Sequence, residues 1–263
     1  MSLRSPNDTR VPSPRMAPVP TQPLPDAEIE RVIVVTAHPD DVDFGSAGTI
    51  ATWTDAGIEV VYCICTDGDA GGSDLEFPRD QIAGVRRAEQ TEAAKRVGVH
   101  DVRFLGYPDG ALIASFELRR DISRVIRQVQ PQRVLVQSPE RDYERVGRSH
   151  PDHRAAGNAA LDAIYPDARN PFAHPELRID ERLDAWVVKE TWIMGGVPGH
   201  PLHYIDVTET FDRKIAALRA HESQTGHMDN LEEFVGKWLS ANAEAAGFEL
   251  GRKAESFLVI ATA

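Results

Sequence analysis

Two short segments rich in histidine and aspartate, at residues 37–45 and 150–153, have the residue types of a metal site. The first reads Ala-His-Pro-Asp-Asp-Val-Asp-Phe-Gly and follows an apolar run at residues 32–35 that is typical of a buried strand. The second reads His-Pro-Asp-His, and proline suits the start of the alanine-rich helix that we expect at residues 154–164. Ligands of open α/β sheets bind beyond the carboxyl ends of the strands. We therefore expect the fold to bring both segments together around one divalent metal.

Three side chains from these segments, His38, Asp41 and His153, form the ligand set of a catalytic zinc site. Such a site uses three His, Asp or Glu ligands and keeps an open position for water. Residues three apart in a helix or turn face the same way, so His38 and Asp41 can bind one ion. The metal lowers the pKa of its bound water to about 7 and polarises the attacked carbonyl. Zn²⁺ is the expected cofactor, and Fe²⁺ also accepts these ligands.

The remaining polar residues of the two segments suit the chemistry around a metal. Asp40 is placed to take a proton from the attacking water. His150, one turn from His153, is expected to stabilise the oxyanion and then to protonate the leaving nitrogen. Asp152 is expected to raise the pKa of His150 through an ion pair. Each segment alone also fits an ordinary turn or a surface pair, but two of them at strand-to-helix junctions favour a metal site.

The composition narrows the class of protein. The 263 residues include 29 Lys and Arg against 41 Asp and Glu, so the formal net charge is −12. This charge argues against sequence-independent nucleic-acid binding and against docking on an anionic membrane. No apolar run reaches membrane-spanning length, and the start lacks the apolar region of a signal peptide. Cys63 and Cys65 lie in one expected strand and suit a reducing compartment, so we expect a cytoplasmic protein.

Strand and helix patterns alternate along most of the chain. Strands are expected at residues 32–36, 59–65, 102–105, 134–137, 185–194, 203–207 and 257–261, and helices at residues 45–56, 79–97, 117–130, 154–164, 211–221 and 231–246. The alternation predicts a single α/β domain at residues 28–263, with a Rossmann-like, mostly parallel sheet and helices on both faces. Residues 165–183 are expected to form an excursion loop. Residues 1–27 hold seven of the 18 prolines and are expected to form a disordered tail.

The sequence resembles the PIG-L, or LmbE-like, family of zinc-dependent N-deacetylases. The resemblance rests on the motifs at residues 37–41 and 150–153, and it extends to Thr66-Asp67-Gly68, Arg86-Arg87-Ala88-Glu89, residues 105–110 and the segment from Lys214 to Gln224. It implies that His38, Asp41 and His153 bind the metal, that Asp40 is the general base, and that His150 is the acid tuned by Asp152. It also implies that Arg86 binds substrate, although a helix-surface ion pair of Arg86 with Glu89 is the alternative.

The resemblance implies an enzyme that removes an N-acetyl group from an amino-sugar-containing small molecule, such as an N-acetylglucosamine conjugate. One alternative is an amidase that acts on a thiol conjugate or a biosynthetic intermediate. Another is a metal-binding protein without turnover, which the presence of Asp40 and His150 disfavours because neither is needed to hold a metal. No Gly-x-Gly-x-x-Gly follows the first strand, so a nucleotide-binding Rossmann protein is disfavoured. A homo-oligomer is allowed, and the oligomeric state is left open.

Two features do not follow from the family pattern alone. Relatives mostly have Glu where this chain has Asp43. The other histidines are expected at the surface or in loops: His100, His174, His200, His203 and His227. His221 ends an expected helix, where a protonated histidine is favourable, and both a structural role and a role facing the site remain open for it.

Overall fold

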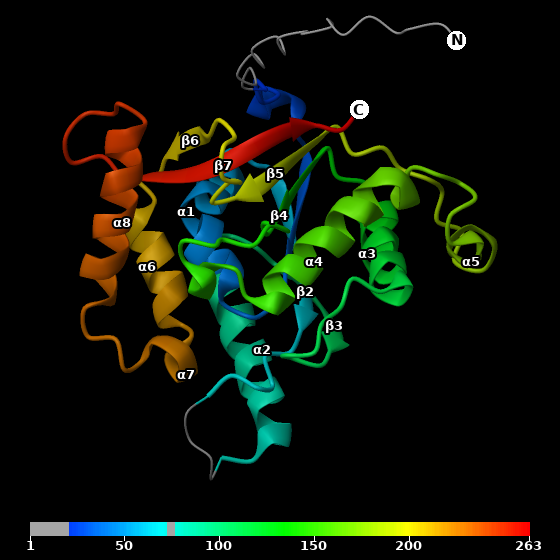
Figure 1. Cartoon of the computed structure of the whole chain (residues 1–263), viewed down its shortest axis with the longest axis horizontal. Coiled ribbons are helices and arrows are strands. Elements are labelled where there is room, and N and C mark those ends of the chain that lie inside the picture. The colour runs from blue at the N-terminus through cyan, green and yellow to red at the C-terminus, as the bar shows by residue number, and fades with distance from the viewer. Residues whose placement is uncertain (1–20, 73–76) are drawn as a thin grey trace, which may run out of the picture.

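A seven-stranded sheet forms the middle layer of the molecule (Figure 1). The structure, a computed structural model, describes residues 21–72 and 77–263. The strands are β1 (Arg31–Thr36), β2 (Glu59–Thr66), β3 (Asp101–Tyr107), β4 (Arg133–Val136), β5 (Glu190–Met194), β6 (His203–Asp206) and β7 (Ala254–Ala261). Their order is β3-β2-β1-β4-β5-β7-β6; the first five run parallel, and β7 is antiparallel to β5 and β6. The predicted α/β fold with a mostly parallel sheet is therefore confirmed.

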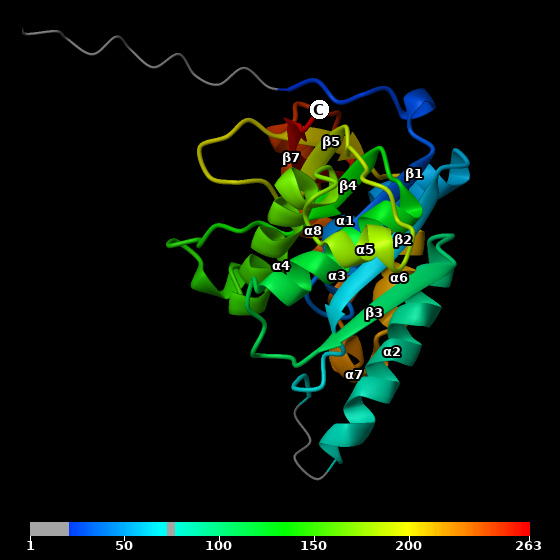
Figure 2. The same cartoon turned by 90° about the vertical axis from the view of Figure 1, so that its right-hand side faces the viewer.

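Helices cover both faces of this sheet (Figure 2). They are α1 (Asp41–Asp55), α2 (Arg79–Arg96), α3 (Phe116–Val129), α4 (Pro151–Asp162), α5 (Pro175–Ile179), α6 (Phe211–Arg219), α7 (Glu222–Thr225) and α8 (Leu231–Ala245), with 3₁₀ turns at Asp26–Glu28 and Val146–Arg148 and a π-helical segment at Ala163–Ala168. Within the described residues, none of the helices combines the length and the apolarity needed to cross a bilayer.

Strand β1 shows how the two layers form. Ile33 and Val35 pack into the core beneath α3 and α4, whereas Val32 and Val34 pack into the core beneath α1 and α2. Successive side chains of a strand point to opposite faces, and both faces of a parallel sheet are buried, so the strand reads as one continuous apolar run. The carboxyl end of β1 therefore delivers the chain to His38 from the centre of the fold.

Helix α1 begins at Asp41, earlier than the predicted start at residue 45. Asp41 and Asp43 lie in its first turn, where the helix dipole favours negative charge. Two glycines let this helix approach the sheet closely. A Cβ atom on Gly45 would lie 2.7 Å from the Met194 sulfur, and one on Gly48 would lie 2.7 Å from the Cβ of Val207. The first histidine and aspartate segment is thus carried by a helix that packs tightly on the sheet.

A buried ion pair fastens the same helix to the rest of the fold. The Lys214 ammonium is fully buried and donates to the carbonyl oxygens of Asp43, at 2.8 Å, and Phe44, at 2.6 Å. It also donates to Glu255, at 2.7 Å, and the Glu255 carboxylate accepts two backbone amides of α1. Buried charges need such pairing and hydrogen bonding, so these contacts fix where the first turns of α1 lie.

The segment at residues 165–183 is more structured than the predicted loop, because it contains α5 and is held to α3 by two arginines. Arg127 is 2 % exposed and donates to four backbone carbonyls within the segment. Arg119 makes two hydrogen bonds to Asp167, at 2.7 and 2.9 Å. His174 lies 3.0 Å from the same carboxylate; it is a loop residue, as expected, but it is buried rather than at the surface.

The predicted tail at residues 1–27 lies mostly outside the described residues. Its last part differs from the prediction, because it is tied to the sheet. The Asp26 carboxylate accepts a hydrogen bond from Arg133, at 2.7 Å, and the Leu24 amide donates to Glu190, at 2.8 Å. Arg133 and Glu190 are buried and paired with each other. These hydrogen bonds hold Leu24 and Asp26 against strands β4 and β5.

Candidate active site

The fold brings the two predicted segments together at the carboxyl ends of neighbouring strands. The first segment follows β1, and the second begins α4, which comes after β4; β1 and β4 pair in parallel. The rings of His38 and His150 are 5.0 Å apart between centroids, and those of His38 and His153 are 5.2 Å apart. Residues separated by more than a hundred positions thus line one site, at the edge of the sheet where ligands of α/β proteins bind.

The Asp41 carboxylate lies between two of these histidines. One of its oxygens is 3.3 Å from Nδ1 of His38, and the other is 2.9 Å from Nε2 of His153. One nitrogen from each of His38, His150 and His153 also lies within 4.8 Å of the others. Imidazole nitrogens with a carboxylate oxygen are the donors that zinc and ferrous iron accept. The donor set therefore fits a divalent transition metal.

The second ring nitrogen of His38 faces two further carboxylates. Its Nε2 is 3.0 Å from Asp109 and 3.3 Å from Asp152. A histidine that ligates a metal through one nitrogen usually donates its other N–H to a carboxylate, which fixes the ring and the tautomer. The arrangement around His38 follows this pattern, with Nδ1 directed to Asp41 and Nε2 to the other two acids.

Asp109 is a site residue that the two histidine and aspartate motifs do not predict. It lies in Pro-Asp-Gly directly after β3, so it reaches the site from a third strand end. Its carboxylate also accepts the backbone amide of Ala70, at 3.1 Å, and its own amide donates to Asp69, at 3.0 Å. The available signal was its position, because an acidic residue at the carboxyl end of a parallel strand lies on the ligand-binding edge.

Asp40 is held in an unusual backbone conformation beside the predicted metal ligands. Its φ angle is 96°, a region that residues other than glycine rarely adopt. Its amide donates to the side-chain oxygen of Gln90, at 2.8 Å, and its carboxylate accepts a hydrogen bond from Arg86, at 3.0 Å. Arg86 also donates to the carbonyl of Pro39. The side chain of Asp40 is thus directed by contacts on both its backbone and its carboxylate.

Arg86 is 3 % exposed, and its described hydrogen bonds go to Asp40 and to the backbone oxygens of Pro39 and Gly68. It does not form the surface pair with Glu89 that was the alternative, since Glu89 bonds to Ser223 instead. These contacts favour a role in orienting Asp40, and the direct role in substrate binding stays a prediction.

The structure places Asp152 on a different partner from the one the sequence predicts. Its carboxylate accepts the amides of Gly110, at 2.7 Å, and Leu112, at 3.3 Å, and it faces His38. It does not pair with His150, because residues two apart in a helix do not face each other. The described contact between them runs from the Asp152 amide to Nδ1 of His150, at 3.2 Å, with His150 as the N-cap of α4.

This placement also affects the charge of His150. Burial, together with the neighbouring His38 and His153, lowers its pKa, and the opposing effect of the Asp152 charge is smaller. The shift runs against the predicted elevation. His150 is nevertheless exposed, and its ring lies 5.0 Å from that of His38 and 5.3 Å from that of His153 between centroids.

The site strongly attracts positive charge. Burial disfavours protonation of His38, but hydrogen bonds to Asp109 and Asp41 raise its pKa to about 10. Burial acts to raise the pKa of Asp41, yet His153 and His38 lower it well below its usual range. Burial and the charge of Asp41 raise the pKa of Asp40 to about 7. Such shifts arise where several carboxylates share a desolvated space, which is also a setting that binds a cation.

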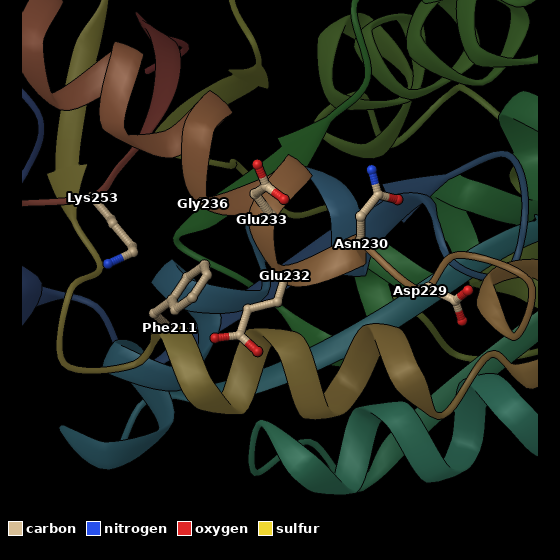
Figure 3. Close-up of a pocket in the computed structure, with 7 residues that line it drawn as sticks. All are labelled: Phe211, Asp229, Asn230, Glu232, Glu233, Gly236 and Lys253. Atoms are coloured by element: carbon tan, nitrogen blue, oxygen red, sulfur yellow. The ribbon is translucent and has the colours of Figure 1, made fainter.

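A separate pocket lies between α6 and α8 (Figure 3). Its lining includes Glu232, Glu233 and Lys253, and the Lys253 ammonium lies 4.6 Å from the centre of the Phe211 ring. It contains no residue of either histidine and aspartate segment, so it is not the site described above.

Known proteins resemble this chain in both sequence and fold. Residues 33–164 match the PIG-L family, described as GlcNAc-PI de-N-acetylase. Diacetylchitobiose deacetylase of Thermococcus kodakarensis is 33 % identical over 198 residues, which cover 75 % of this chain and 71 % of that protein. A probable N-acetyl-alpha-D-glucosaminyl L-malate deacetylase 2 of Bacillus cereus is 33 % identical over 207 residues, which cover 75 % and 85 %. The structure of N,N'-diacetylchitobiose deacetylase from Pyrococcus horikoshii, complexed with its inhibitor MPG, has a TM-score of 0.81 at 29 % identity and covers 90 % of this chain and 86 % of that one.

The fold and these matches together define an α/β protein of the LmbE type. The chain belongs to the PIG-L family of de-N-acetylases. The relatives named above are N-deacetylases, which are hydrolases of linear amide bonds.

Proposed function

We propose that this protein is a metal-dependent N-deacetylase that removes the acetyl group from an N-acetylglucosamine-containing saccharide or conjugate. The observation that carries the proposal is the Asp41 carboxylate lying between His38 and His153, with Asp40 next to it in the chain. Two named relatives support the substrate class, because one acts on diacetylchitobiose and the other on an N-acetylglucosaminyl malate.

In this proposal His38, Asp41 and His153 hold one Zn²⁺ or Fe²⁺ ion. The ion would supply a water of lowered pKa and would polarise the amide carbonyl. Asp40 accepts the proton of the attacking water, because it directly precedes the proposed ligand Asp41 in the chain. Asp109 and Asp152 accept from Nε2 of His38 and so fix the ring orientation.

The leaving nitrogen needs a proton, and His150 is the side chain proposed to supply it. Because Nδ1 of His150 accepts the Asp152 amide, a neutral His150 carries its one hydrogen on Nε2. To act as the acid, His150 must be protonated on both ring nitrogens, with the Nδ1 proton replacing the hydrogen bond from the Asp152 amide; the leaving nitrogen then takes the Nε2 proton and neutral imidazole remains. The same N–H can donate to the oxyanion that forms when water adds to the carbonyl. Asp152 also takes part in catalysis in this scheme. Its contacts support a role in orienting two rings, because its carboxylate faces His38 and its backbone amide donates to His150, rather than an ion pair with His150.

The experiment that tests this proposal measures acetate release from a panel of amides. The panel contains N,N'-diacetylchitobiose, an N-acetylglucosaminyl malate and N-acetylated thiol conjugates. We expect acetate from the amino sugars, loss of activity after chelation, and recovery with Zn²⁺ or Fe²⁺. Activity on the thiol conjugates alone would favour the amidase alternative. Full activity in a sample shown by metal analysis to be free of metal would contradict the metal-dependent mechanism.

A further inference from the structure

We propose that Gln90 is a positioning residue for Asp40: its side-chain amide holds the Asp40 backbone in the conformation that directs the carboxylate into the site. The inference rests on the proposed role of Asp40 as the general base. It assigns a function to a buried glutamine of α2 that lies outside both histidine and aspartate segments.

The conformation of Asp40 needs an explanation from its surroundings. Its φ of 96° and ψ of −30° lie in a region where an L-residue with a side chain is strained. Strained backbone of this kind persists only where the neighbouring structure over-determines it. Asp40 is the residue from which α1 begins, so a relaxation of its φ would redirect its side chain relative to Asp41.

Gln90 provides the contact that fixes this peptide. It is fully buried, and its Oε1 accepts the Asp40 amide at 2.8 Å. Its Nε2 donates to the Asp43 carboxylate, also at 2.8 Å. A backbone N–H can only donate and an ionised carboxylate can only accept. The two neighbours therefore impose one orientation on the Gln90 amide, and a side chain of similar length without both functions cannot replace it.

The far end of this contact is also held firmly. The Asp43 oxygen that accepts from Gln90 lies 2.9 Å from Nε2 of His221. Asp43 and His221 are both fully buried. The three side chains come from α1, α2 and the residue that precedes α7, so three separate elements fix the position of the Gln90 amide. This gives Asp43 a role: it anchors the glutamine that holds Asp40.

The link from Gln90 to catalysis passes through a single peptide group. The backbone N–H that Gln90 binds is that of Asp40, whose carboxylate is the proposed base. A displacement of about 1 Å at a reacting group can cost roughly a hundredfold in rate. Gln90 has no described hydrogen bond to His38, Asp41 or His153, so its loss should affect proton transfer and leave metal binding intact.

The test compares Gln90→Met with a matched control, Gln132→Met. Gln132 is also a buried glutamine that accepts backbone amides, those of Glu30 at 3.1 Å and Arg31 at 2.8 Å, but it lies at the opposite end of β1. Kinetics are measured on the zinc-loaded enzyme with N,N'-diacetylchitobiose, alongside zinc content and Tm. We expect Gln90→Met to lower kcat roughly ten- to a hundredfold, with KM within about twofold and zinc content unchanged. Gln132→Met should lower Tm and leave kcat unchanged.

A kcat of Gln90→Met within about twofold of wild type would overturn the proposal, as would an equal loss of kcat in Gln132→Met. If Gln90→Met fails to fold, Gln90→Asn serves in its place, because its shorter amide cannot reach both partners. Crystal structures give a readout that needs no substrate: a φ of Asp40 that stays in the left-handed region in the variant overturns the proposal, and a φ that leaves it supports the proposal. Should wild type not hydrolyse the disaccharide, the proposed substrate class fails, while these structures still decide the role of Gln90.

Discussion

The two segments of the site differ in how firmly the fold holds them. In the first, residues 37–45, the side chains of His38 and Asp41 are about one-tenth exposed, and Asp43 is fully buried. In the second, residues 150–153, His150 is exposed and follows a largely exposed stretch at residues 138–149. The difference teaches that two proposed ligands, His38 and Asp41, lie in the firmly held first segment together with the proposed base. The proposed acid, His150, lies at the exposed side of the site, in the segment that also supplies the partly buried third ligand, His153.

Hydrogen bonds from several strands and helices account for the rigidity of the first segment. The Ala37 amide donates to Gln137, at 2.8 Å, and the Ala37 carbonyl accepts from both the amide and the hydroxyl of Thr66. Gln90 and Arg86 then hold the backbone on the other side of His38. The side chain of His150, by contrast, has one described hydrogen bond, from the Asp152 amide. A substitution in the first segment should therefore disturb both the structure and the chemistry of the site. A substitution of His150 should disturb only the chemistry.

The largest effect is expected from Asp40→Asn. This change removes the proposed base while keeping the size of the side chain, so kcat should fall roughly a hundred- to ten-thousandfold. Metal content should stay at the wild-type level, because the proposed ligands His38, Asp41 and His153 are unchanged. The measurements are initial rates of acetate release and metal analysis of the purified variant.

Asp55→Asn provides a matched control at the other end of the same helix. Asp55 pairs with Arg213 through both carboxylate oxygens, each at 2.7 Å, on an exposed surface. Its loss should leave kcat unchanged, since exposed pairs contribute only about 0–1 kcal/mol to stability. A loss of metal in Asp40→Asn would mean that Asp40 is a ligand and that the base has been assigned wrongly.

A smaller loss is expected from His150→Ala, which tests the second segment. Removing one oxyanion donor costs about a hundredfold or more in kcat. Because the His150 side chain is exposed and makes one described hydrogen bond, Tm should change little. An unchanged kcat would reject the role as acid and oxyanion donor. A large drop in Tm would show that the second segment is held as firmly as the first, which would remove the contrast between them.

Much of the fold follows from local patterns in the sequence. The helix expected at residues 117–130 forms as α3 and buries one apolar face, because a helix that covers a sheet must present such a face to it; the face consists of Leu118, Ile122, Val125, Ile126 and Val129. Boundaries were predicted less well where tertiary contacts decide them. The strand expected from residue 185 begins at Glu190, and the strand expected from residue 257 begins at Ala254. Glu190 and Ala254 are positions where cross-strand pairing starts or ends, and pairing is set by the neighbouring strand rather than by local composition.

The motifs that supply the proposed metal ligands were predictable from the sequence. The residues that hold these motifs in place were not. His38, Asp41 and His153 stand in two compact motifs whose spacing carries the signal. Asp109 and Gln90 are single residues with no such spacing, and only the packing of β3 and α2 brings them to the site. The same reason explains the misplacement of Asp152, because the sequence shows that it is near His150 but does not show which way the helix turns it.

The smallest effect is expected from His221→Gln, which changes the buried partner of Asp43 in the first segment. Burial disfavours the charged form of His221, but its hydrogen bond to Asp43 and the charges of Asp43, Asp40 and Glu89 raise its pKa above the usual 6.5. A raised pKa in the folded state means that protonated His221 stabilises the fold. This contribution is fully present below pH 6.5 and is lost as the pH rises through the folded-state value.

The loss of stability in His221→Gln should therefore be greatest below pH 6.5 and should shrink at higher pH. Removing a buried hydrogen bond to a charged group costs about 1–3 kcal/mol, which sets the scale at the acidic end. Urea unfolding of both proteins across the pH range measures it, with His203→Gln as a control, since the pKa of His203 is lowered by burial and by Arg133. For that residue the pH dependence should run the other way. A loss in His221→Gln that stays constant with pH would mean that His221 acts only as a neutral hydrogen-bonding group, and the first segment would then be fixed by packing rather than by charge.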